Sequence, residues 1–76
     1  MNEQIHLDLR GLSCPLPLLR LKQRLNQMQI GDEVRVLTTD PGSVRDFAAF
    51  FSQAGHVLLE HHVTESQFEF LIRKAV

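Results

Sequence analysis

The chain has 76 residues, of which 43% are hydrophobic and 22% are charged, and its formal net charge is −1 at pH 7. This length suits one small domain, so we expect residues 1–76 to form a single domain. The near-neutral charge gives no general attraction to nucleic acid or to an anionic membrane, and no apolar stretch approaches the length of a membrane span. The N-terminal residues lack the pattern of a signal peptide, so we expect a cytoplasmic protein.

Cys14 is the only cysteine in the sequence. One cysteine cannot form an internal disulfide, and without a Cys-x-x-Cys pair the chain cannot run an intramolecular dithiol cycle. Any chemistry at Cys14 therefore involves a second molecule.

The first part of the chain predicts a strand followed by a helix. Apolar and polar residues alternate over residues 5–9, which is the period of a strand with one buried face. Residues 15–29 then carry apolar side chains at three- and four-residue spacing, which is typical of a helix with one buried stripe. The stripe consists of Leu18, Leu21, Leu25 and Met28. Gly31 and Asp32 follow as the predicted end of this helix.

The middle of the chain predicts a second strand and a second helix. Alternation over residues 34–38 indicates the strand. The helix begins in the turn 40–43, either with Asp40 as its cap or with Ser43 as its cap and Asp46 three residues later. Its predicted buried face consists of Val44, Phe47, Ala48, Phe51 and Ala54. Gly55 stands where a helix-terminating glycine is expected.

The last part of the chain predicts a hairpin, with strands over residues 56–63 and 67–74 joined by a turn at 64–66. The element order is then β-α-β-α-β-β. Crossovers that contain a helix join parallel strands and are almost always right-handed. We therefore expect an α+β fold, a two-layer α/β sandwich in which a four-stranded mixed sheet carries both helices on one face.

The turn before the first predicted helix contains Cys14. Pro15 fits the first helical position and disfavours α geometry in the residue before it, which predicts Cys14 as the N-cap residue. A thiolate there would lie at the positive end of the helix dipole, which contributes about 0.3–1 kcal/mol and lowers the thiol pKa by less than about one unit. Arg10 and Arg20 could add to this effect. The alternative is a small buried cysteine, but the neighbouring prolines favour exposure.

The segment from Leu7 to Pro17 reads Leu-Asp-Leu-Arg-Gly-Leu-Ser-Cys-Pro-Leu-Pro and resembles the signature of the TusA-like (SirA-like) sulfur-carrier family. The mark of that family is a Cys-Pro-x-Pro turn after the first strand. Other stretches look like family positions in the expected order, namely Gly31-Asp32, Asp40-Pro41-Gly42, Val44-Arg45-Asp46, Gly55-His56 and Leu71-Ile72-Arg73-Lys74. The resemblance covers nearly the whole chain, and it implies the β-α-β-α-β-β fold.

The resemblance also implies a function. Family members accept sulfane sulfur as a persulfide on the motif cysteine, here Cys14, with Pro15 and Pro17 as motif partners at the helix start. Without a full catalytic cycle of their own, they relay sulfur from a cysteine desulfurase or another sulfurtransferase to an acceptor protein. The relay serves tRNA thiolation, molybdenum-cofactor enzymes or sulfur oxidation. Two departures bear on the pathway: Leu16 replaces the Glu frequent in tRNA thiolation, and residues 47–51 lack the proline or second cysteine of some members.

Two leucines of the first predicted helix lie away from its buried stripe and near the cysteine turn. We expect Leu16 and Leu19 to be exposed, either as scattered surface leucines or as a patch that a sulfur donor or acceptor covers. Arg20, Lys22 and Arg24 form a basic edge of the same helix, which is either a solvated face or a surface that steers partners. Candidate docking residues are therefore Leu16, Leu19, Arg20 and Arg24.

The sequence predicts no metal site and no cofactor motif. His61 and His62 are adjacent and should point to opposite faces of a strand, so they do not share an ion easily. Asp40 and Asp46 are interpreted as helix caps rather than as an acid–base pair.

Two other functions stay open: a redox sensor that uses Cys14 alone, and a small regulatory or RNA-associated binding module. The net charge of −1 and the absence of Tyr and Trp disfavour RNA binding, and the oligomeric state is open.

Overall fold

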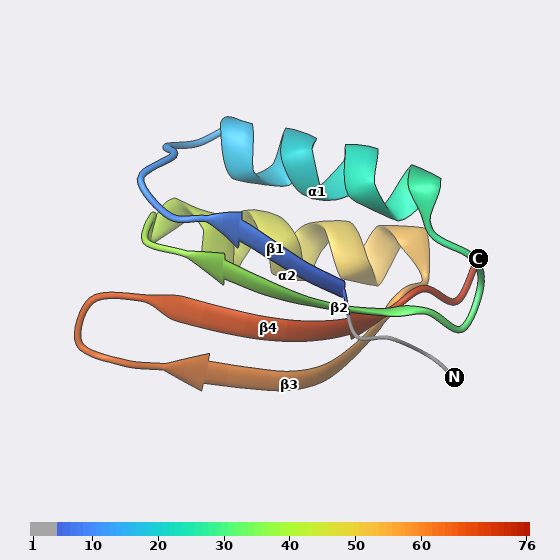
Figure 1. Cartoon of the computed structure of the whole chain (residues 1–76). Helices are drawn as coiled ribbons and strands as arrows, with labels where there is room; N and C mark the ends of the chain where they lie inside the picture. The colour runs from blue at the N-terminus through green and yellow to red at the C-terminus, as the bar shows by residue number, and fades with distance from the viewer. Residues whose placement is uncertain (1–4) are drawn as a thin grey trace.

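The structure is a computed structural model, and it describes residues 5–76. Residues 1–4, on which the signal-peptide prediction rests, lie outside the described part. The elements follow the predicted order β-α-β-α-β-β (Figure 1). They are β1 (Ile5–Leu9), α1 (Leu16–Gln27), β2 (Glu33–Thr38), α2 (Gly42–Ala54), β3 (Val57–Val63) and β4 (Phe68–Arg73). Neither helix is long and apolar enough to cross a membrane.

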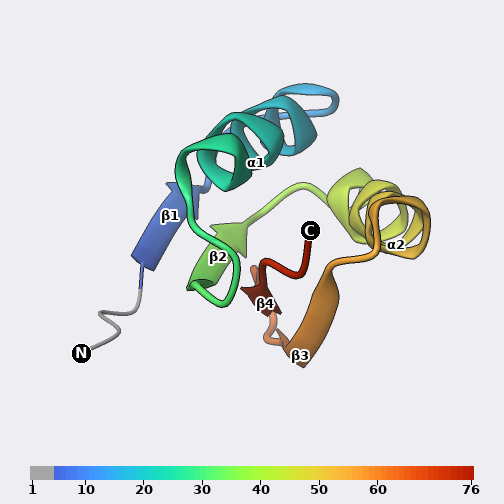
Figure 2. The same ribbon diagram turned by 90° about the vertical axis from the view of Figure 1, so that its right-hand side faces the viewer.

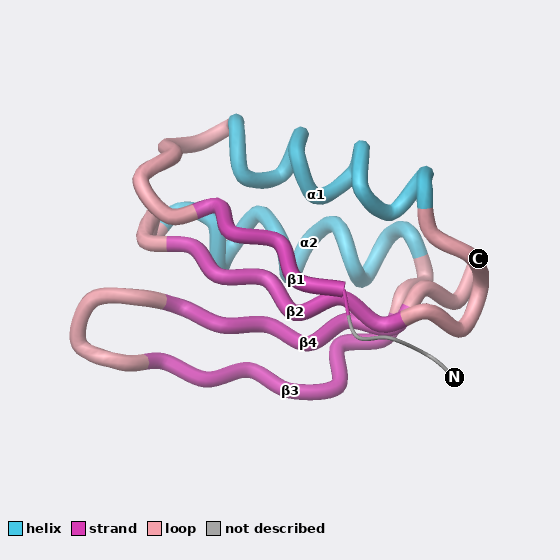
Figure 3. Tube along the Cα trace, viewed as in Figure 1, coloured by secondary structure: helices cyan, strands magenta, loops and turns pink. Residues whose placement is uncertain are grey.

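The four strands form one mixed sheet in the order β1-β2-β4-β3. β1 pairs with β2 in parallel, whereas β4 is antiparallel to both β2 and β3. Figure 2 shows both helices on one side of the sheet, and Figure 3 shows the two helices running along the strands. The α+β fold, with two layers and both helices on one face, is therefore confirmed.

The core lies between the sheet and the two helices, and it is built from the predicted periodicities. In β2 the burial alternates residue by residue, with Val34, Val36 and Thr38 facing the helices. The apolar core residues are Leu9, Leu21, Leu25, Met28, Val34, Val36, Phe47, Phe51, Phe70 and Ile72. Complete burial of one such large side chain contributes roughly 1.5–3 kcal/mol. The prediction for Ala48 is wrong, because this residue is exposed at the edge of the helical face.

The first helix begins one residue later than predicted. Pro15 occupies the N-cap position of α1, with φ −96° and ψ 11°, and no side chain caps this end. Cys14 is therefore the residue before the cap, and the peptide bond between Cys14 and Pro15 is cis. The turn is closed by the backbone instead, since the Leu16 N–H donates to the Ser13 carbonyl over 2.9 Å. Cys14 thus does not cap the helix, and its side chain is available for other contacts.

The second helix also begins differently from either predicted start. Pro41 is the N-cap residue of α2, and Asp40 precedes it. The Asp40 carboxylate still accepts the Gly42 N–H over 3.3 Å, which satisfies one donor of the first turn. Ser43 is buried and lies 3.2 Å from the Thr38 hydroxyl, so it joins α2 to β2 rather than capping. At the other end Gly55 adopts φ 84°, as a helix-terminating glycine does.

The end of the molecule that carries the C-terminus is closed around Lys74 (Figure 1). Its ammonium donates to the Leu25 carbonyl over 2.7 Å and to the Met28 carbonyl over 2.8 Å. Its backbone bonds with Gly31 and Asp32, which follow α1. Lys74 therefore fixes the C-terminal end of α1 to the end of β4. The loops that follow β1 and β2 lie at the opposite end of the sheet.

Candidate functional site

The parallel pairing of β1 and β2 brings two loops together at one end of the sheet. The loop after β1 contains Cys14, and the loop after β2 contains Asp40. Two hydrogen bonds join them: the Gly11 N–H donates to the Thr39 hydroxyl over 2.9 Å, and the Cys14 N–H donates to an Asp40 carboxylate oxygen over 2.8 Å. Gly11 has a φ of 82°, a conformation that favours glycine and that turns the chain away from β1. The Cys14 backbone is thereby held against the start of α2.

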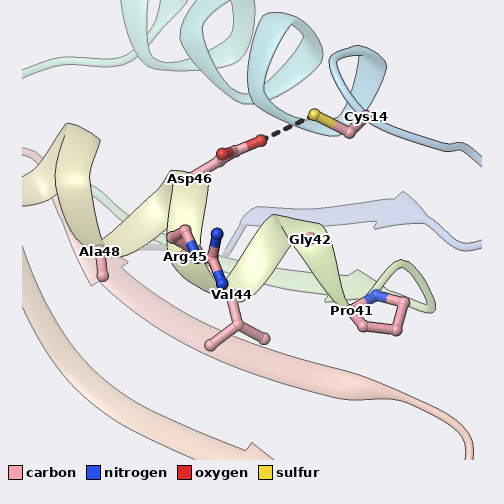
Figure 4. A pocket seen from close by; sticks show the side chains of 7 residues that line it. All are labelled: Cys14, Pro41, Gly42, Val44, Arg45, Asp46 and Ala48. Atoms are coloured by element: carbon pink, nitrogen blue, oxygen red, sulfur yellow. Dashed lines mark hydrogen bonds between the residues drawn. The ribbon is translucent and has the colours of Figure 1, made fainter.

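The Cys14 thiol points at a carboxylate of the second helix. Cys14 is exposed, and its Sγ donates a hydrogen bond to Oδ2 of Asp46 over 2.8 Å. Figure 4 shows the Asp46 side chain turned toward Cys14, whereas the side chains of Val44 and Ala48 point away from the thiol. The interpretation of Asp46 as a helix cap is wrong, because its carboxylate contacts the cysteine rather than the backbone of α2.

The electrostatics of Cys14 differ from the sequence prediction. The hydrogen bond to Asp46 raises the pKa of the Cys14 thiol above its ordinary value, and loss of solvation and the charges of Asp46 and Asp40 act in the same direction. The predicted lowering by the dipole of α1 is therefore wrong in sign, because a carboxylate at hydrogen-bond distance outweighs a partial charge. Arg10 does not offset the carboxylates, since its guanidinium bonds to Asp8 over 2.9 and 2.8 Å.

A shallow pocket opens beside the thiol, with a volume of about 560 Å³. Cys14 contributes to its wall from one side, and the remainder comes from the first turns of α2 and the residue before them. The lining residues are Cys14, Pro41, Gly42, Val44, Arg45, Asp46 and Ala48. The pocket thus offers the thiol to a visiting molecule across a surface that combines apolar groups with a cation and a carboxylate.

The other predicted site residues lie on α1, close in sequence to the thiol. Leu16 and Leu19 are 44% and 48% exposed, which confirms the predicted exposure. Arg20 is exposed, whereas Arg24 is half-buried and donates to the Gln27 side chain over 3.1 Å. Lys22 makes a cation–π contact, with its ammonium 5.2 Å from the centre of the Phe50 ring.

The two motif prolines differ in environment. Pro15 is exposed beside Cys14, and Pro17 is buried. Pro17 lies in the first turn of α1, where a missing backbone N–H leaves no intrahelical partner unsatisfied. The two prolines therefore start the helix without placing a polar side chain beside the thiol.

The adjacent histidines of β3 point to opposite faces of the sheet, as predicted. The His61 ring stacks on Phe70 with 4.6 Å between ring centres, and the His62 ring lies 3.0 Å from a Glu60 carboxylate oxygen. Phe70 belongs to the core under the helices, so His61 lies on that side and His62 on the open side. Neither histidine lines the pocket at Cys14.

Asp46 is a partner of Cys14 that the sequence does not predict. The two residues are 32 positions apart, and no spacing rule connects them. The only available signal is topological: the first strand must pair in parallel with the second, so the loops that follow both strands lie at the same edge. The parallel pairing indicates the start of α2 as the neighbour of Cys14, but it does not distinguish Asp40 from Asp46.

The fold and the site together define a small two-layer α/β protein with a single exposed cysteine before its first helix. The model of one family, described as Sulfurtransferase TusA, matches residues 5–74. The chain therefore belongs to the TusA family.

Similar proteins are described as sulfur carriers or as SirA-like. Sulfur carrier protein TusA from Allochromatium vinosum is 51% identical over 69 residues, which cover 91% of each chain. A putative sulfur carrier protein from Neisseria meningitidis is 49% identical over 96% of this chain and 97% of the relative. The crystal structure of a SirA-like protein from Desulfitobacterium hafniense superposes with a TM-score of 0.80 at 24% identity, covering 95% of this chain and 99% of that one. This last likeness concerns the fold.

Proposed function

We propose that the protein carries sulfur as a persulfide on Cys14. The Cys14 thiolate attacks the outer sulfur of a donor persulfide, the donor S–S bond breaks, and the donor sulfur leaves with the electron pair as a thiolate. The outer sulfur is then bonded to Cys14, and no external oxidant or reductant is consumed. The observation that carries this proposal is an exposed cysteine, the only one in the chain, in a member of the TusA family.

The absence of a second cysteine from the sequence suits storage of the persulfide. A neighbouring thiol would attack the Cys14 persulfide and release the sulfur as sulfide while a disulfide formed. The sequence contains no such thiol, so only a thiol of another molecule can collect the sulfur. Delivery is therefore the loading step in the opposite direction, from Cys14 to the acceptor.

The partners are proteins at both steps. The donor is a cysteine desulfurase or another sulfurtransferase, and the acceptor is a protein thiol of a cytoplasmic relay. The relay serves tRNA thiolation, molybdenum-cofactor enzymes or sulfur oxidation. Support comes from the surface next to the thiol, where Leu16 and Leu19 are exposed on the helix that Cys14 precedes. We assign docking to these leucines, with Arg20 and Arg24 as steering charges on the same helix.

A redox sensor is disfavoured by the surroundings of Cys14. Sensor cysteines react as thiolates and are selected for a low pKa. Here the hydrogen bond to Asp46 raises the pKa of the Cys14 thiol. This direction disfavours reaction with peroxide, which requires the thiolate.

The test is intact-protein mass spectrometry after incubation with a cysteine desulfurase and cysteine. We expect the mass of one sulfur atom to be added, to be lost on reduction, and to be absent from Cys14→Ser. Serine retains a hydroxyl that can donate to Asp46, so the variant should fold like the natural chain. A labile sulfur on Cys14→Ser, or no loading from desulfurase, thiosulfate sulfurtransferase or polysulfide, contradicts the proposal.

A further inference from the structure

Asp46 accepts the hydrogen bond of the Cys14 thiol, but it takes no part in the bond exchange of the proposed sulfur transfer. The thiol Sγ and the Asp46 Oδ2 are 2.8 Å apart, and the Asp40 carboxylate accepts the Cys14 N–H over 2.8 Å. Cys14 therefore contacts one carboxylate through its sulfur and a second carboxylate through its backbone N–H. A sulfur atom that changes charge during a reaction is sensitive to such neighbours.

We propose that Asp46 biases the carrier toward delivery, because its carboxylate stabilises the empty Cys14 thiol and destabilises the persulfide anion of the loaded carrier. Asp46 acts through its charge and its hydrogen bond to Cys14, and it exchanges no atoms with the sulfur. The proposal rests on the proposed function of Cys14 as a persulfide carrier. The role of Asp46 goes further than that function, because it makes the empty carrier more favourable than the loaded carrier.

The empty carrier satisfies Asp46. An ionised carboxylate only accepts hydrogen bonds, and a thiol can donate one. The observed geometry joins these two groups, so the proton of Cys14 is held in place by a charge-assisted bond. This contact stabilises the neutral thiol relative to any anionic form of the same sulfur, in agreement with the direction in which Asp46 shifts the thiol pKa.

The loaded carrier does not satisfy Asp46. A hydropersulfide is a stronger acid than a thiol, so the loaded state carries a negative charge on its outer sulfur near neutral pH. Neither sulfur of this anion has a proton to donate, and the outer sulfur lies only one S–S bond of about 2.05 Å beyond Sγ. The persulfide is therefore a like charge beside Asp46, with Asp40 adding to the repulsion.

Delivery removes this conflict and balances without a further reagent. The acceptor thiolate attacks the outer sulfur, the S–S bond to Cys14 breaks, and the Cys14 sulfur takes the electron pair and the proton that the acceptor thiol released. The negative charge moves from the carrier to the acceptor persulfide. The Cys14 S–H then restores the hydrogen bond to Asp46. The carboxylate thus raises the free energy of the loaded carrier and lowers that of the empty carrier, and both effects favour delivery.

The other charged groups around the site do not cancel the two carboxylates. Arg45 lines the same pocket from α2, but the charges that shift the pKa of the Cys14 thiol are those of Asp46 and Asp40. Arg10, in the loop that leads to Cys14, is bound to Asp8. Arg20 is exposed on α1 and makes no ion pair within the described residues. Both carboxylates act on the Cys14 thiol in the same direction, raising its pKa.

The test is a competition for sulfur between two empty carriers. Asp46→Asn replaces the carboxylate by an amide of nearly the same shape, and isotope labelling of the natural chain separates the two proteins by mass. Both are incubated with a limiting amount of donor persulfide until the sulfur has equilibrated, and intact masses give the loaded fraction of each. We expect the sulfur to favour Asp46→Asn by about tenfold, the ratio for one lost charge-assisted contact.

Two controls separate the role of Asp46 from general charge and from folding. Asp32→Asn removes a carboxylate near the opposite end of the sheet, where it accepts the Gln29 N–H over 2.9 Å, and should share sulfur equally with the natural chain. Asp46→Glu retains the charge and should return the partition toward equality. A second readout is the pH dependence of alkylation by iodoacetamide, whose midpoint should fall in Asp46→Asn and stay unchanged in Asp32→Asn.

Equal sharing of sulfur between Asp46→Asn and the natural chain overturns the inference, and so does a tenfold preference for Asp32→Asn. In both cases Cys14 still loads, so the proposed function stands. Failure of the natural chain to load under any donor is the separate result that refutes the function itself.

Discussion

The two ends of α1 are fixed in opposite ways. At the C-terminal end, the Lys74 ammonium donates to two helix carbonyls over 2.7 and 2.8 Å, which places a cation at the negative end of the helix dipole. At the N-terminal end no side chain caps the helix, and Cys14 stands in front of it, exposed, with Asp46 as its partner. The Lys74 side chain covers the C-terminal end of α1, whereas the N-terminal end, with the exposed Cys14, is accessible to a second molecule.

This difference separates stability from reactivity along a single helix. The contacts of Lys74 are partly buried, so their loss leaves helix carbonyls without partners. The contacts of the Cys14 side chain are at the surface, where water replaces a lost hydrogen bond at little cost. We therefore expect changes at the Lys74 end to lower the free energy of unfolding, and changes at the Cys14 end to alter sulfur transfer.

The largest effect on stability is expected from Lys74→Met, which keeps the length of the side chain and removes the ammonium. Two hydrogen bonds to a charged donor are lost, so the free energy of unfolding should fall by about 2–3 kcal/mol, while the fraction of Cys14 loaded with sulfur stays unchanged. Urea titration measures the first quantity and intact mass the second. Lys22→Met is the matched control, because the Lys22 ammonium contacts only the face of Phe50 at 5.2 Å and should cost less than about 1 kcal/mol. Equal losses in the two variants would refute the role given to Lys74.

A smaller effect on stability, combined with an effect on the thiol, is expected from Asp40→Ala. This change removes the acceptor of the Cys14 N–H and of the Gly42 N–H, and should lower the free energy of unfolding by about 1–2 kcal/mol. It should also lower the pKa of the Cys14 thiol, but by less than Asp46→Asn does, since Asp40 acts on the sulfur through its charge alone.

Urea titration and the pH midpoint of alkylation test these two effects of Asp40. Asp8→Ala serves as the control for the urea titration, because this carboxylate is exposed and solvent screens its ion pair with Arg10. An unchanged alkylation midpoint in Asp40→Ala would show that the charge of Asp40 does not reach the sulfur.

An effect on transfer without an effect on stability is expected from Leu16→Ser combined with Leu19→Ser. Both leucines are exposed beside the cysteine turn, so a protein donor should load the double variant several-fold more slowly, while loading by inorganic polysulfide proceeds at the natural rate. Rates are measured by quenched intact mass. Ile30→Ser is the control, because Ile30 is 70% exposed but follows the far end of α1. Equal slowing with polysulfide, or slowing in Ile30→Ser, argues against docking at these leucines.

The smallest effect is a pH dependence of stability from His56, near the Lys74 end. Burial, followed by the charge of Lys74, lowers the pKa of His56, and its Nδ1 lies 3.2 Å from the Ala75 N–H, whose hydrogen bond it accepts. Because the folded state disfavours the protonated ring, stability is fully present above the ordinary pKa of about 6.5 and is lost as pH falls toward the lowered value.

His56→Asn keeps an acceptor for Ala75 but cannot titrate, so its urea midpoint should change less between pH 7.5 and 5.5 than that of the natural chain. His62→Asn is the control, since this histidine is exposed and bonds to Glu60. If the natural chain and His56→Asn respond equally to pH, His56 is not the group responsible.

Local patterns explain what could be predicted from the sequence. The spacing of Leu21, Leu25 and Met28 identified the buried side of α1, and the alternation in residues 34–38 identified the helix-facing side of β2. These signals succeed because helix and strand periodicities place side chains without reference to the rest of the chain. Ala48 was assigned to the wrong side, because a small apolar residue at the edge of a helix face is decided by whether a neighbour covers it.

The sequence alone determined the element order, the two-layer fold and a single exposed thiol before the first helix, because these depend on periodicity, turn residues and a cysteine count. Only the tertiary structure decided the chemical surroundings of that thiol. The pairing of β1 with β2 places Asp46 against Cys14 across 32 residues, and the carboxylate reverses the effect expected from the dipole of the cysteine's own helix. Electrostatic interactions weaken with distance in space rather than along the chain, so the group that sets the charge of Cys14 could be found only by folding.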